Sequence, residues 1–242
     1  MTQIQVSQPT LYRMRCERKT QLTRSVYTYE FSLLDPGTIA FTPGQFGTII
    51  VSPTVRRSYS FCSWDAEGKQ VSLVVDTAPG GPGSQYFLGL EPSAEVSMMA
   101  PLGHFHLPES FSHAVCVATG TGIAPFISMF DFLSSHGNGH EYGSIRFYWG
   151  LRSKEDLYWE DKLKQYVRTI PDFSYDIVLS REQGEWSGKR GHVTEYVIEE
   201  GNTHPDAHFC FCGNGTMITD VQTQLVSKGI PRERIMKDVY FK

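Results

Sequence analysis

Residues 114–118 read Ala-Val-Cys-Val-Ala and residues 119–125 read Thr-Gly-Thr-Gly-Ile-Ala-Pro, and this stretch decides the fold of the second half of the chain. The apolar run predicts a strand buried on both faces, and the glycines after it predict a tight loop. Pro125 suits the first turn of a helix, where an amide hydrogen would have no partner. Apolar side chains at helical spacing follow, namely Phe126, Met129, Phe130 and Leu133. The stretch therefore predicts a strand, a glycine loop and a helix in succession.

The same alternation of strand and helix continues towards the C-terminus. Further strands are expected at 145–149, 175–179 and 208–211. A helix is expected at 156–167, with apolar residues on one side, namely Leu157, Leu163, Tyr166 and Val167. A last helix carries the apolar stripe Met217, Val221 and Leu225. Apolar strands alternating with helices imply a parallel sheet covered on both faces, so residues 109–242 are predicted to form an α/β parallel-sheet domain.

The first half of the chain, residues 1–108, has a different pattern. Short β-rich runs alternate with turns rich in Gly, Pro and Asp, and these runs are 25–31, 45–51, 59–64, 70–76 and 95–100. Strands of this length and spacing are typical of a small antiparallel β-barrel. We place the boundary between the two predicted domains near Leu107-Pro108-Glu109.

The composition narrows the possible function classes. Of the 242 residues, 40% are hydrophobic and 20% are charged, which favours a folded core over disorder. The formal net charge is −4 and no long run of one sign occurs, so neither a nucleic-acid groove nor a polybasic membrane patch is supported. No apolar run has the length of a signal peptide or a membrane span. The expectation is a cytoplasmic protein, and we expect a monomer.

The cysteines and histidines do not follow a metal-binding pattern. The 5 cysteines are an odd number spread over predicted strands, which favours free thiols in a reducing compartment over a disulfide framework. Cys210 and Cys212 have no second pair, so neither a zinc site nor an iron–sulfur cluster is indicated. The 8 histidines do not form the clusters that a metal centre needs. We therefore expect no bound metal.

Three loops of the second half are candidates for ligand binding, because ligands of parallel sheets bind at the carboxyl ends of the strands. The glycine loop 119–125 offers backbone amides and a helix N-terminus to a phosphate, although a tight turn explains the same residues. In Cys212-Gly213-Asn214 the thiol would face a cofactor, or would be a buried structural cysteine. Ser180-Arg181 suits a phosphomonoester, although an exposed Arg is also ordinary.

In the barrel half, Arg57-Ser58-Tyr59-Ser60 combines a cation, a flat ring and hydroxyls, and Gly80 to Ser84 offers a second group of backbone amides. Each alone is an ordinary turn or strand edge. Together with the loops of the second half, they resemble the ferredoxin–NADP reductase superfamily in order and spacing, over nearly the whole chain. The matching motifs are Arg57–Ser60, Gly81–Ser84, Pro101–Phe105, Gly120–Pro125, Tyr148–Arg152 with Asp156–Tyr158, and Cys212–Asn214.

The resemblance implies that the barrel binds FAD. Arg57 would bind the flavin pyrophosphate, Tyr59 would stack on the isoalloxazine, and Ser60 would lie near flavin N5, which accepts the hydride. The other residues that the resemblance assigns to FAD are Ser58, Gly81, Gly83 and Ser84.

The resemblance also implies that the α/β domain binds a nicotinamide nucleotide. The residues assigned to its pyrophosphate are Thr119, Gly120, Thr121, Gly122 and Pro125. Cys212 and Gly213 would lie beside the nicotinamide. Ser180, Arg181 and Arg152 resemble residues that bind the 2′-phosphate in NADPH-using members. Residues 186–191 instead resemble members that often take NADH, and residues 191–193 depart from the Gly-Arg-Ile of bacterial members. NADPH is favoured. Tyr240 resembles the aromatic that covers the flavin in plant-type members, so the candidate catalytic residues are Ser60, Cys212 and Tyr240.

The activity implied is hydride transfer from NAD(P)H to FAD, followed by electron transfer to a one-electron acceptor. Without a cysteine-rich segment of its own, the chain would need a separate acceptor, namely a ferredoxin, a flavodoxin or an oxygenase component. Two alternatives are an NAD(P)H–flavin reductase that releases reduced flavin and a non-catalytic electron-transfer subunit. A basic group would attract an acidic partner or form a solvated face, namely Arg13, Arg15, Arg18, Lys19 and Arg24.

Overall fold

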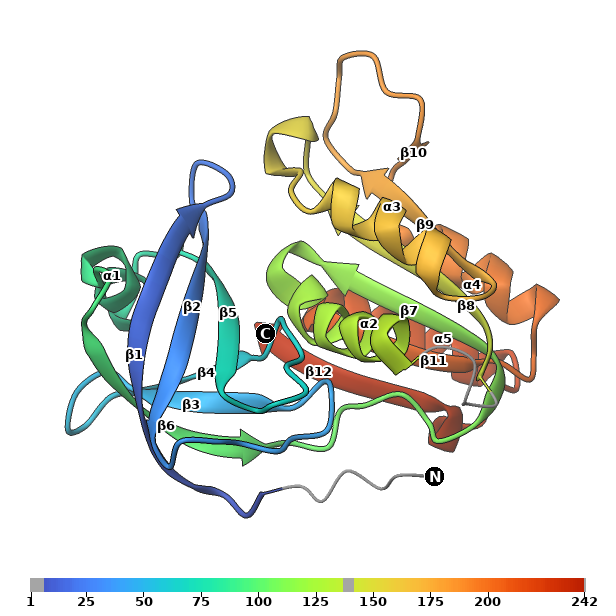
Figure 1. Cartoon of the computed structure of the whole chain (residues 1–242). Helices are drawn as coiled ribbons and strands as arrows, with labels where there is room; N and C mark the ends of the chain where they lie inside the picture. The colour runs from blue at the N-terminus through green and yellow to red at the C-terminus, as the bar shows by residue number, and fades with distance from the viewer. Residues whose placement is uncertain (1–6, 137–141, 242) are drawn as a thin grey trace. The chain divides into compact units, whose positions relative to one another are not determined.

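The computed structural model describes residues 7–136 and 142–241, so residues 1–6 and Lys242 of the expected domains lie outside the described residues. The chain divides into two compact units (Figure 1). One unit contains the described residues up to His106 together with Ala124–Phe132, and the other contains Leu107–Ile123 and the chain from Leu133 onward. Within the described residues, no helix is both long enough and apolar enough to span a membrane.

The first unit is built on an antiparallel sheet of 6 strands in the order β4-β3-β6-β1-β2-β5, which confirms the predicted barrel. The strands and the one helix between them are β1 Thr10–Gln21, β2 Val26–Asp35, β3 Phe46–Ile50, β4 Arg56–Ser60, β5 Gln70–Asp76, α1 Pro82–Gly89 and β6 Glu95–Leu102. Strands β2, β3, β5 and β6 match predicted runs. Strand β1 and helix α1 were not predicted.

The strand expected at 59–64 begins and ends nearer the N-terminus, at 56–60. The residues after it pair with β5, and this pairing nearly closes the barrel. Strand β4 ends at Ser60, after which Phe61 forms a bridge with Leu73 of β5. The amide of Cys62 donates to the carbonyl of Ser72, also in β5, at 2.9 Å. The chain therefore leaves its pairing with β3 and continues along the opposite edge strand, because closing the sheet satisfies backbone groups that an open edge would expose.

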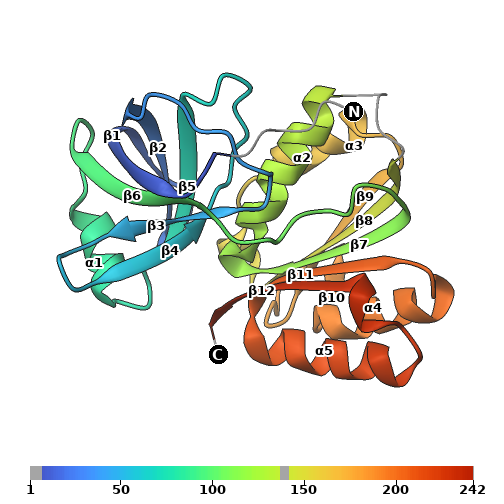
Figure 2. The same cartoon turned by 90° about the horizontal axis from the view of Figure 1, so that it is seen from below.

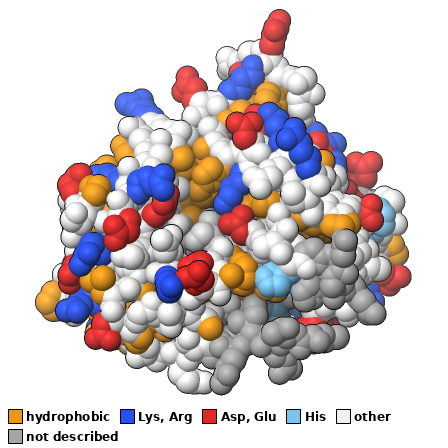
Figure 3. All heavy atoms as spheres, in the orientation of Figure 1, with side chains coloured by type: hydrophobic (Ala, Val, Ile, Leu, Met, Phe, Trp, Pro, Cys, Tyr) orange, Lys and Arg blue, Asp and Glu red, His pale blue; other side chains and the backbone are white. Residues whose placement is uncertain are grey.

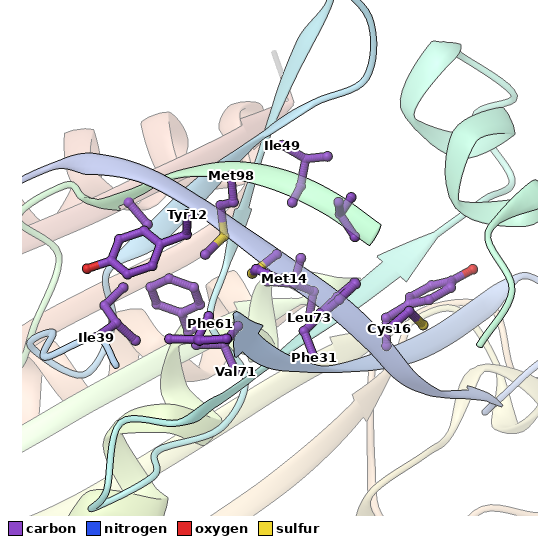
Figure 4. Close-up of a cluster of buried hydrophobic side chains, with 14 of the residues drawn as sticks. Tyr12, Met14, Cys16, Phe31, Ile39, Ile49, Phe61, Val71, Leu73 and Met98 are labelled. Carbon is purple, nitrogen blue, oxygen red and sulfur yellow. The ribbon is translucent and has the colours of Figure 1, made fainter. Parts of the chain in front are cut away.

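The core of the barrel consists of alternate residues of its strands. Tyr12, Met14 and Cys16 of β1 point inward and are almost completely buried, while the residues between them are exposed. They meet Phe31 and Leu73 in the cluster drawn in Figure 4. Burying a side chain of this kind contributes about 1.5–3 kcal/mol, so this shared core holds the strands together.

The second unit contains a parallel sheet of 6 strands in the order β10-β9-β8-β7-β11-β12, as predicted for an α/β domain. Its elements are β7 Phe111–Thr119, the 3-10 turn η1 Gly120–Ile123, β8 Tyr142–Leu151, η2 Lys154–Asp156, α3 Glu160–Thr169, β9 Phe173–Leu179, β10 Lys189–Arg190, α4 Val193–Thr203, β11 His208–Asn214, α5 Gly215–Ser227, η3 Arg232–Arg234 and β12 Ile235–Phe241. Helices α4 and α5 cover one face of this sheet and α3 lies on the other (Figure 2). Helix α2, Ala124–His136, follows η1 as predicted.

The helix expected at 156–167 begins later, at Glu160. Asp156 instead belongs to the turn η2, where its carboxylate accepts from the amide of Ser153 at 3.0 Å. The ring of Tyr158 packs against Trp149 with 4.8 Å between centroids, and this tertiary contact takes residues 157–159 out of the helix. Val167, expected on the buried side, is 48% exposed, whereas Leu163 and Tyr166 are buried as expected.

Candidate functional site

The two barrel motifs that were predicted to bind FAD lie next to each other. Tyr59 and Arg57 are on β4, and Gly83 is in the first turn of α1. A Cβ atom added to Gly83 would overlap the Tyr59 hydroxyl and would lie 3.0 Å from Cγ of Arg57. Glycine therefore permits this close packing, in which the first turn of α1 lies directly on β4. The structure brings a cation, an aromatic ring and a helix N-terminus to one place in the barrel.

The first turn of α1 offers backbone amides to an anion. Gly81 is the N-cap, Pro82 follows it without an amide hydrogen, and no acidic side chain lies in the first turn. The amides of Gly83 and Ser84 have no partner within the helix at these positions, since the first residues of any helix lack one. Amides at a helix N-terminus, together with the helix dipole, favour a phosphate. Arg57, which is exposed, adds a full positive charge beside them.

Tyr59 is held by an aromatic neighbour. Its ring meets Phe87 edge-on, with 4.8 Å between centroids. Burial raises the pKa of Tyr59 to about 12, so the phenol stays neutral at any physiological pH. Ser60, one residue on, is 3% exposed, and the hydroxyl of Ser58 lies 3.0 Å from that of Thr48 on β3. A neutral, fixed ring is suited to stacking on a flat apolar ligand.

In the second unit, the glycine loop packs on Cys212–Asn214 at the carboxyl edge of the sheet; these residues were expected to form a loop but are the end of strand β11. A Cβ atom on Gly122 would lie 2.5 Å from the carbonyl oxygen of Cys212. Gly213 has a φ of 126°, and a side chain there would overlap the Thr119 hydroxyl. The Thr119 hydroxyl in turn accepts from the amide of Asn214 at 2.9 Å. Two of the three predicted loops therefore form one joined structure.

The carbonyl of Gly120, at the tip of the glycine loop, is fixed by two aromatic side chains that sequence reasoning missed. The indole of Trp149 donates to it at 2.9 Å and the hydroxyl of Tyr158 donates at 3.4 Å. Both residues lie inside motifs that carried the family resemblance, which was the available signal. Fixing this carbonyl orients the loop, so Thr121 and Gly122 present their backbone at the sheet edge.

Cys212 lies at the carboxyl end of β11, where it was predicted, and it is fully buried. Burial, and after it the charge of Asp238, raises the pKa of the Cys212 thiol well above its ordinary value, while Tyr240 acts in the opposite direction. The thiol is therefore neutral, and it is suited to packing or orienting rather than to acting as a base or nucleophile. Tyr240, on β12, lies beside it, so two predicted catalytic residues come together.

The predicted phosphate-binding residues Arg152, Ser180 and Arg181 follow neighbouring strands. The amide of Ser180 donates to the carbonyl of Leu151 at 3.0 Å, and the amide of Arg181 donates to the carbonyl of Arg152 at 2.8 Å. Both arginine side chains are exposed, and within the described residues neither guanidinium has a hydrogen-bonding or ionic partner. Two exposed arginines that follow neighbouring strands are suited to an anionic ligand.

Arg190, on β10, contacts the loop that follows Arg181. Its guanidinium donates to the carbonyls of Glu182 and Gly184 at 2.5 and 2.6 Å. The Glu182 carboxylate accepts from the amides of Lys154 and Gly184, at 3.0 and 2.7 Å, and these bonds lower its pKa. Arg190 and Glu182 therefore brace the loop that follows Arg181.

The basic residues of β1 do not form a positive patch. Each of four faces a carboxylate: Arg13–Glu95 at 3.8 Å, Arg15–Glu95 at 4.0 Å, Arg18–Glu30 at 2.9 Å and Lys19–Glu91 at 3.0 Å. On the face seen in Figure 3, Lys and Arg side chains are interspersed with Asp and Glu side chains. Exposed pairs of this kind contribute little stability, but these three carboxylates reduce the positive field of the four cations that would attract an acidic partner.

The expectation that the histidines form no metal-type cluster is wrong for His113 and His204. Their ring nitrogens and a carboxylate oxygen of Glu200 lie within 4.8 Å of one another. His113 is far from Glu200 and His204 in the sequence and meets them only because α4 packs on β7. No spacing rule along the chain detects such a group.

The residues fit FAD in the barrel and a nicotinamide nucleotide in the sheet domain. In the barrel, the absence of a side chain on Gly83 lets the first turn of α1 pack directly on Tyr59 and Arg57, which brings its amides beside the ring and the cation. In the sheet domain, Gly122 and Gly213 allow a close approach of backbone at the carboxyl edge, and the exposed Arg152 and Arg181 carry positive charge beside it. Both cradles consist of amides, cations and rings, which are the groups that bind pyrophosphates and flat bases.

Comparisons with known proteins agree with this geometry. A family described as an oxidoreductase FAD-binding domain matches residues 13–107, and one described as an oxidoreductase NAD-binding domain matches residues 116–223. Ferredoxin–NADP reductase B of Sorangium cellulosum is 30% identical over 230 residues, which cover 90% of this chain and 93% of that protein. The electron transfer component of xylene/toluene monooxygenase from Pseudomonas putida is 32% identical over 217 residues, covering 88% of this chain and 61% of that protein.

Solved structures share the fold. The cytochrome P450 reductase GcoB of Amycolatopsis superimposes with a TM-score of 0.85 at 23% identity, covering 97% of this chain and 71% of that one. A ferredoxin NADP+ reductase from Neisseria gonorrhoeae with bound FAD and NADP gives 0.78 at 20% identity, covering 97% and 100%. The chain spans 64% and 55% of the toluate and anthranilate dioxygenase electron transfer components that it also resembles.

Proposed function

Because the chain belongs to the ferredoxin–NADP reductase superfamily of FAD- and nicotinamide-binding oxidoreductases, we propose that it is an FAD-dependent NAD(P)H reductase. When bound, FAD accepts a hydride from the nicotinamide and releases its electrons singly. The proposal rests above all on the packing of Gly83 against Tyr59 and Arg57, which joins two separate motifs into one cradle. We assign residues 1–108 to FAD and residues 109–242 to the nucleotide.

In the barrel, the chain's own residues bind and orient the flavin. Arg57 and the amides of Gly83 and Ser84 hold the pyrophosphate, because they place a cation and helix-terminal donors together. Tyr59 stacks on the isoalloxazine, and its contact with Phe87 limits the positions that the ring can take. Ser60 is buried beside it and serves as a neutral polar neighbour for the ring edge.

In the sheet domain, the residues hold the nucleotide and exclude water. The glycine loop and the end of β11, around Thr119, Gly122 and Gly213, receive the pyrophosphate. The buried, neutral thiol of Cys212 and the neighbouring Tyr240 position the nicotinamide. Positioning of reacting groups supplies about 7–11 kcal/mol in favourable cases, which suits a site without a general acid or base.

The two exposed arginines support NADPH as the preferred donor. The 2′-phosphate is the only group that distinguishes NADPH from NADH, so the preference needs uncompensated positive charge at one place. Arg152 and Arg181 supply this charge, and Ser180, which directly precedes Arg181, adds a hydroxyl.

The acceptor is proposed to be a separate redox protein, such as an oxygenase component or a ferredoxin. Relatives include both oxygenase electron transfer components and a ferredoxin–NADP reductase, which supports this class of acceptor. The paired charges of β1 do not favour a strongly acidic partner on that strand.

Flavin content and pre-steady-state reduction test the proposal. The purified protein is expected to retain FAD after dialysis and to lose its flavin absorbance on anaerobic mixing with NADPH. Colourless protein that reduces added flavin would instead identify an NAD(P)H–flavin reductase. A flavoprotein that NADPH and NADH leave oxidised would identify a non-catalytic electron-transfer subunit.

The Arg181→Ala variant tests the nucleotide preference. Removing one charge-assisted hydrogen bond costs about 1.5–3 kcal/mol, or roughly 10–150-fold. We expect kcat/KM with NADPH to fall by that factor, while kcat/KM with NADH, the internal control, changes little. An equal loss with both nucleotides, or a wild-type protein that is faster with NADH, would overturn the assignment.

A further inference from the structure

A cluster of two histidines and one glutamate lies on the face of the parallel sheet that α4 covers. Oε2 of Glu200 is 3.7 Å from Nε2 of His113 and 3.3 Å from Nδ1 of His204. The two imidazole rings also contact each other, with 4.1 Å between their centroids. The three ligating atoms all lie within 4.8 Å of one another. None of these residues has a role in the proposed reaction.

The fold brings these side chains together from two elements. His113 has the same parity along β7 as Val115 and Val117, which pack against α4 and α5, so its side chain emerges on that face. Glu200 lies in the last turn of α4, and His204 is the C-cap residue of that helix, with its Nδ1 3.3 Å from Oε2 of Glu200. A strand and the C-terminal end of a helix thus position the three groups.

The surrounding residues orient the ligating atoms. The Ser144 hydroxyl, directly opposite His113 in the sheet, lies 2.6 Å from Nδ1 of His113. That hydroxyl lies 3.5 Å from the Ser112 carbonyl, to which it can donate, so it can accept from Nδ1–H in the His113 tautomer that carries its lone pair on Nε2. Nε2 is itself buried and has no hydrogen-bonding partner among the described residues.

The glutamate is oriented in the same manner. Its other oxygen, Oε1, accepts from the Tyr148 hydroxyl at 2.6 Å and lies 3.7 Å from Nε of Arg146. Oε2 is therefore the oxygen that faces both imidazoles. Outer hydrogen bonds that fix the tautomer of a histidine and the orientation of a carboxylate are typical of metal sites.

We propose that His113, Glu200 and His204 bind a divalent transition metal ion of the Zn²⁺ class. Two imidazole nitrogens and a carboxylate oxygen form a ligand set that Zn²⁺ prefers, whereas Mg²⁺ and Ca²⁺ prefer oxygen ligands alone. Tetrahedral Zn²⁺ with bonds of about 2.0–2.1 Å separates its ligand atoms by roughly 3.3 Å. The separations of 3.3 and 3.7 Å to Oε2 already approach that value. The His204 side chain is 45% exposed, which gives an ion and a water ligand access.

The site is separate from the nucleotide edge. His113 is near the amino end of β7, whereas Thr119 ends the strand at the glycine loop. Six residues at about 3.3 Å each place them roughly 20 Å apart along the strand. The proposal is therefore independent of the proposed reductase function, and metal binding is expected to tie the end of α4 to β7.

Calorimetric titration of the full chain with Zn²⁺ tests the site. We expect one saturable Zn²⁺ per chain with micromolar or tighter affinity and no competition from Mg²⁺. His204→Ala is expected to weaken binding by more than about 100-fold, because even the loss of an outer hydrogen bond costs 10–100-fold. Ser144→Ala, which keeps all three ligands, is expected to weaken it by about 10–100-fold.

The matched control is His136→Ala, which removes an exposed histidine from the end of α2. It is expected to leave Zn²⁺ affinity unchanged, and the circular dichroism and melting temperature of each metal-free variant establish that it folds. A wild-type chain that binds no Zn²⁺ would show that the cluster is an ion pair between imidazolium and carboxylate, and would overturn the proposal. Equal affinity in His204→Ala and wild type would also overturn it.

Discussion

The Gly83→Ala variant tests the FAD cradle most directly. The added methyl group would overlap the Tyr59 hydroxyl and lie 3.0 Å from Cγ of Arg57. The hydroxyl is at the end of a side chain that can swing, whereas β4 is fixed by its pairing with β3. We therefore expect the ring of Tyr59 to move and the barrel to stay folded.

The expected rise in the Kd for FAD follows from the contacts that the Tyr59 ring loses when it moves. Its edge-on contact with Phe87 contributes about 0.5–1.5 kcal/mol beyond area burial. Overpacking a close contact costs about 1–3 kcal/mol in all. Since the displaced ring is the one proposed to stack on the flavin, the Kd for FAD is expected to rise about 5- to 150-fold. Fluorescence quenching during titration of the apoprotein with FAD measures this Kd.

A double variant tests whether the overlap with the Tyr59 hydroxyl causes the loss of FAD affinity. Tyr59→Phe removes the atom that the methyl group overlaps but keeps the ring, so Gly83→Ala combined with Tyr59→Phe is expected to bind FAD better than Gly83→Ala alone. The expected coupling energy is about 1 kcal/mol or more. Gly89→Ala, in the same helix but with no atom within 4 Å of the added carbon, is the control and is expected to keep wild-type affinity. Additive effects, or an unchanged Kd in Gly83→Ala, would refute the reasoning.

Three further predictions concern the two units separately. Gly122→Ala places a methyl group 2.5 Å from the Cys212 carbonyl oxygen, which is backbone and cannot swing aside. Calorimetry should therefore show a melting temperature lower by about 2–12 °C. An unchanged melting temperature would contradict the close packing of the glycine loop on Cys212. Cys212→Ala is expected to bind NADPH but to slow flavin reduction in stopped-flow, and an unchanged rate would remove the thiol from the site. Burial raises the pKa of Tyr59 from 10.0 to about 12, so the phenol ionises at a lower pH in the unfolded chain than in the folded one. The contribution of the neutral, buried phenol to the free energy of unfolding is therefore lost as pH rises from about 10 to about 12. Urea unfolding of Tyr59→Phe should show a weaker loss over that range, and an identical slope would place the ring in solvent.

The order of motifs along the chain was sufficient to predict both architectures. The apolar run 114–118 became β7 and the glycines after it became the turn η1, because a buried strand and a tight loop are determined by neighbouring residues. The strand expected at 59–64 and the helix expected at 156–167 had the wrong boundaries. In both, a contact distant in sequence decided the outcome, namely the bridge from Phe61 to Leu73 and the packing of Tyr158 on Trp149.

The residue types needed to bind FAD and a nucleotide were also readable from the sequence, since glycines, arginines and aromatic rings at characteristic spacing are local features. Which of them touch was decided only by the tertiary structure. Gly83 lets α1 pack on the Tyr59 hydroxyl, and Gly122 lets the glycine loop pack on the backbone of Cys212 in β11. The approach of His113 to Glu200 and His204 depends on the packing of α4 over β7. Periodicity specifies which face a side chain occupies, but only packing between elements specifies what that face meets.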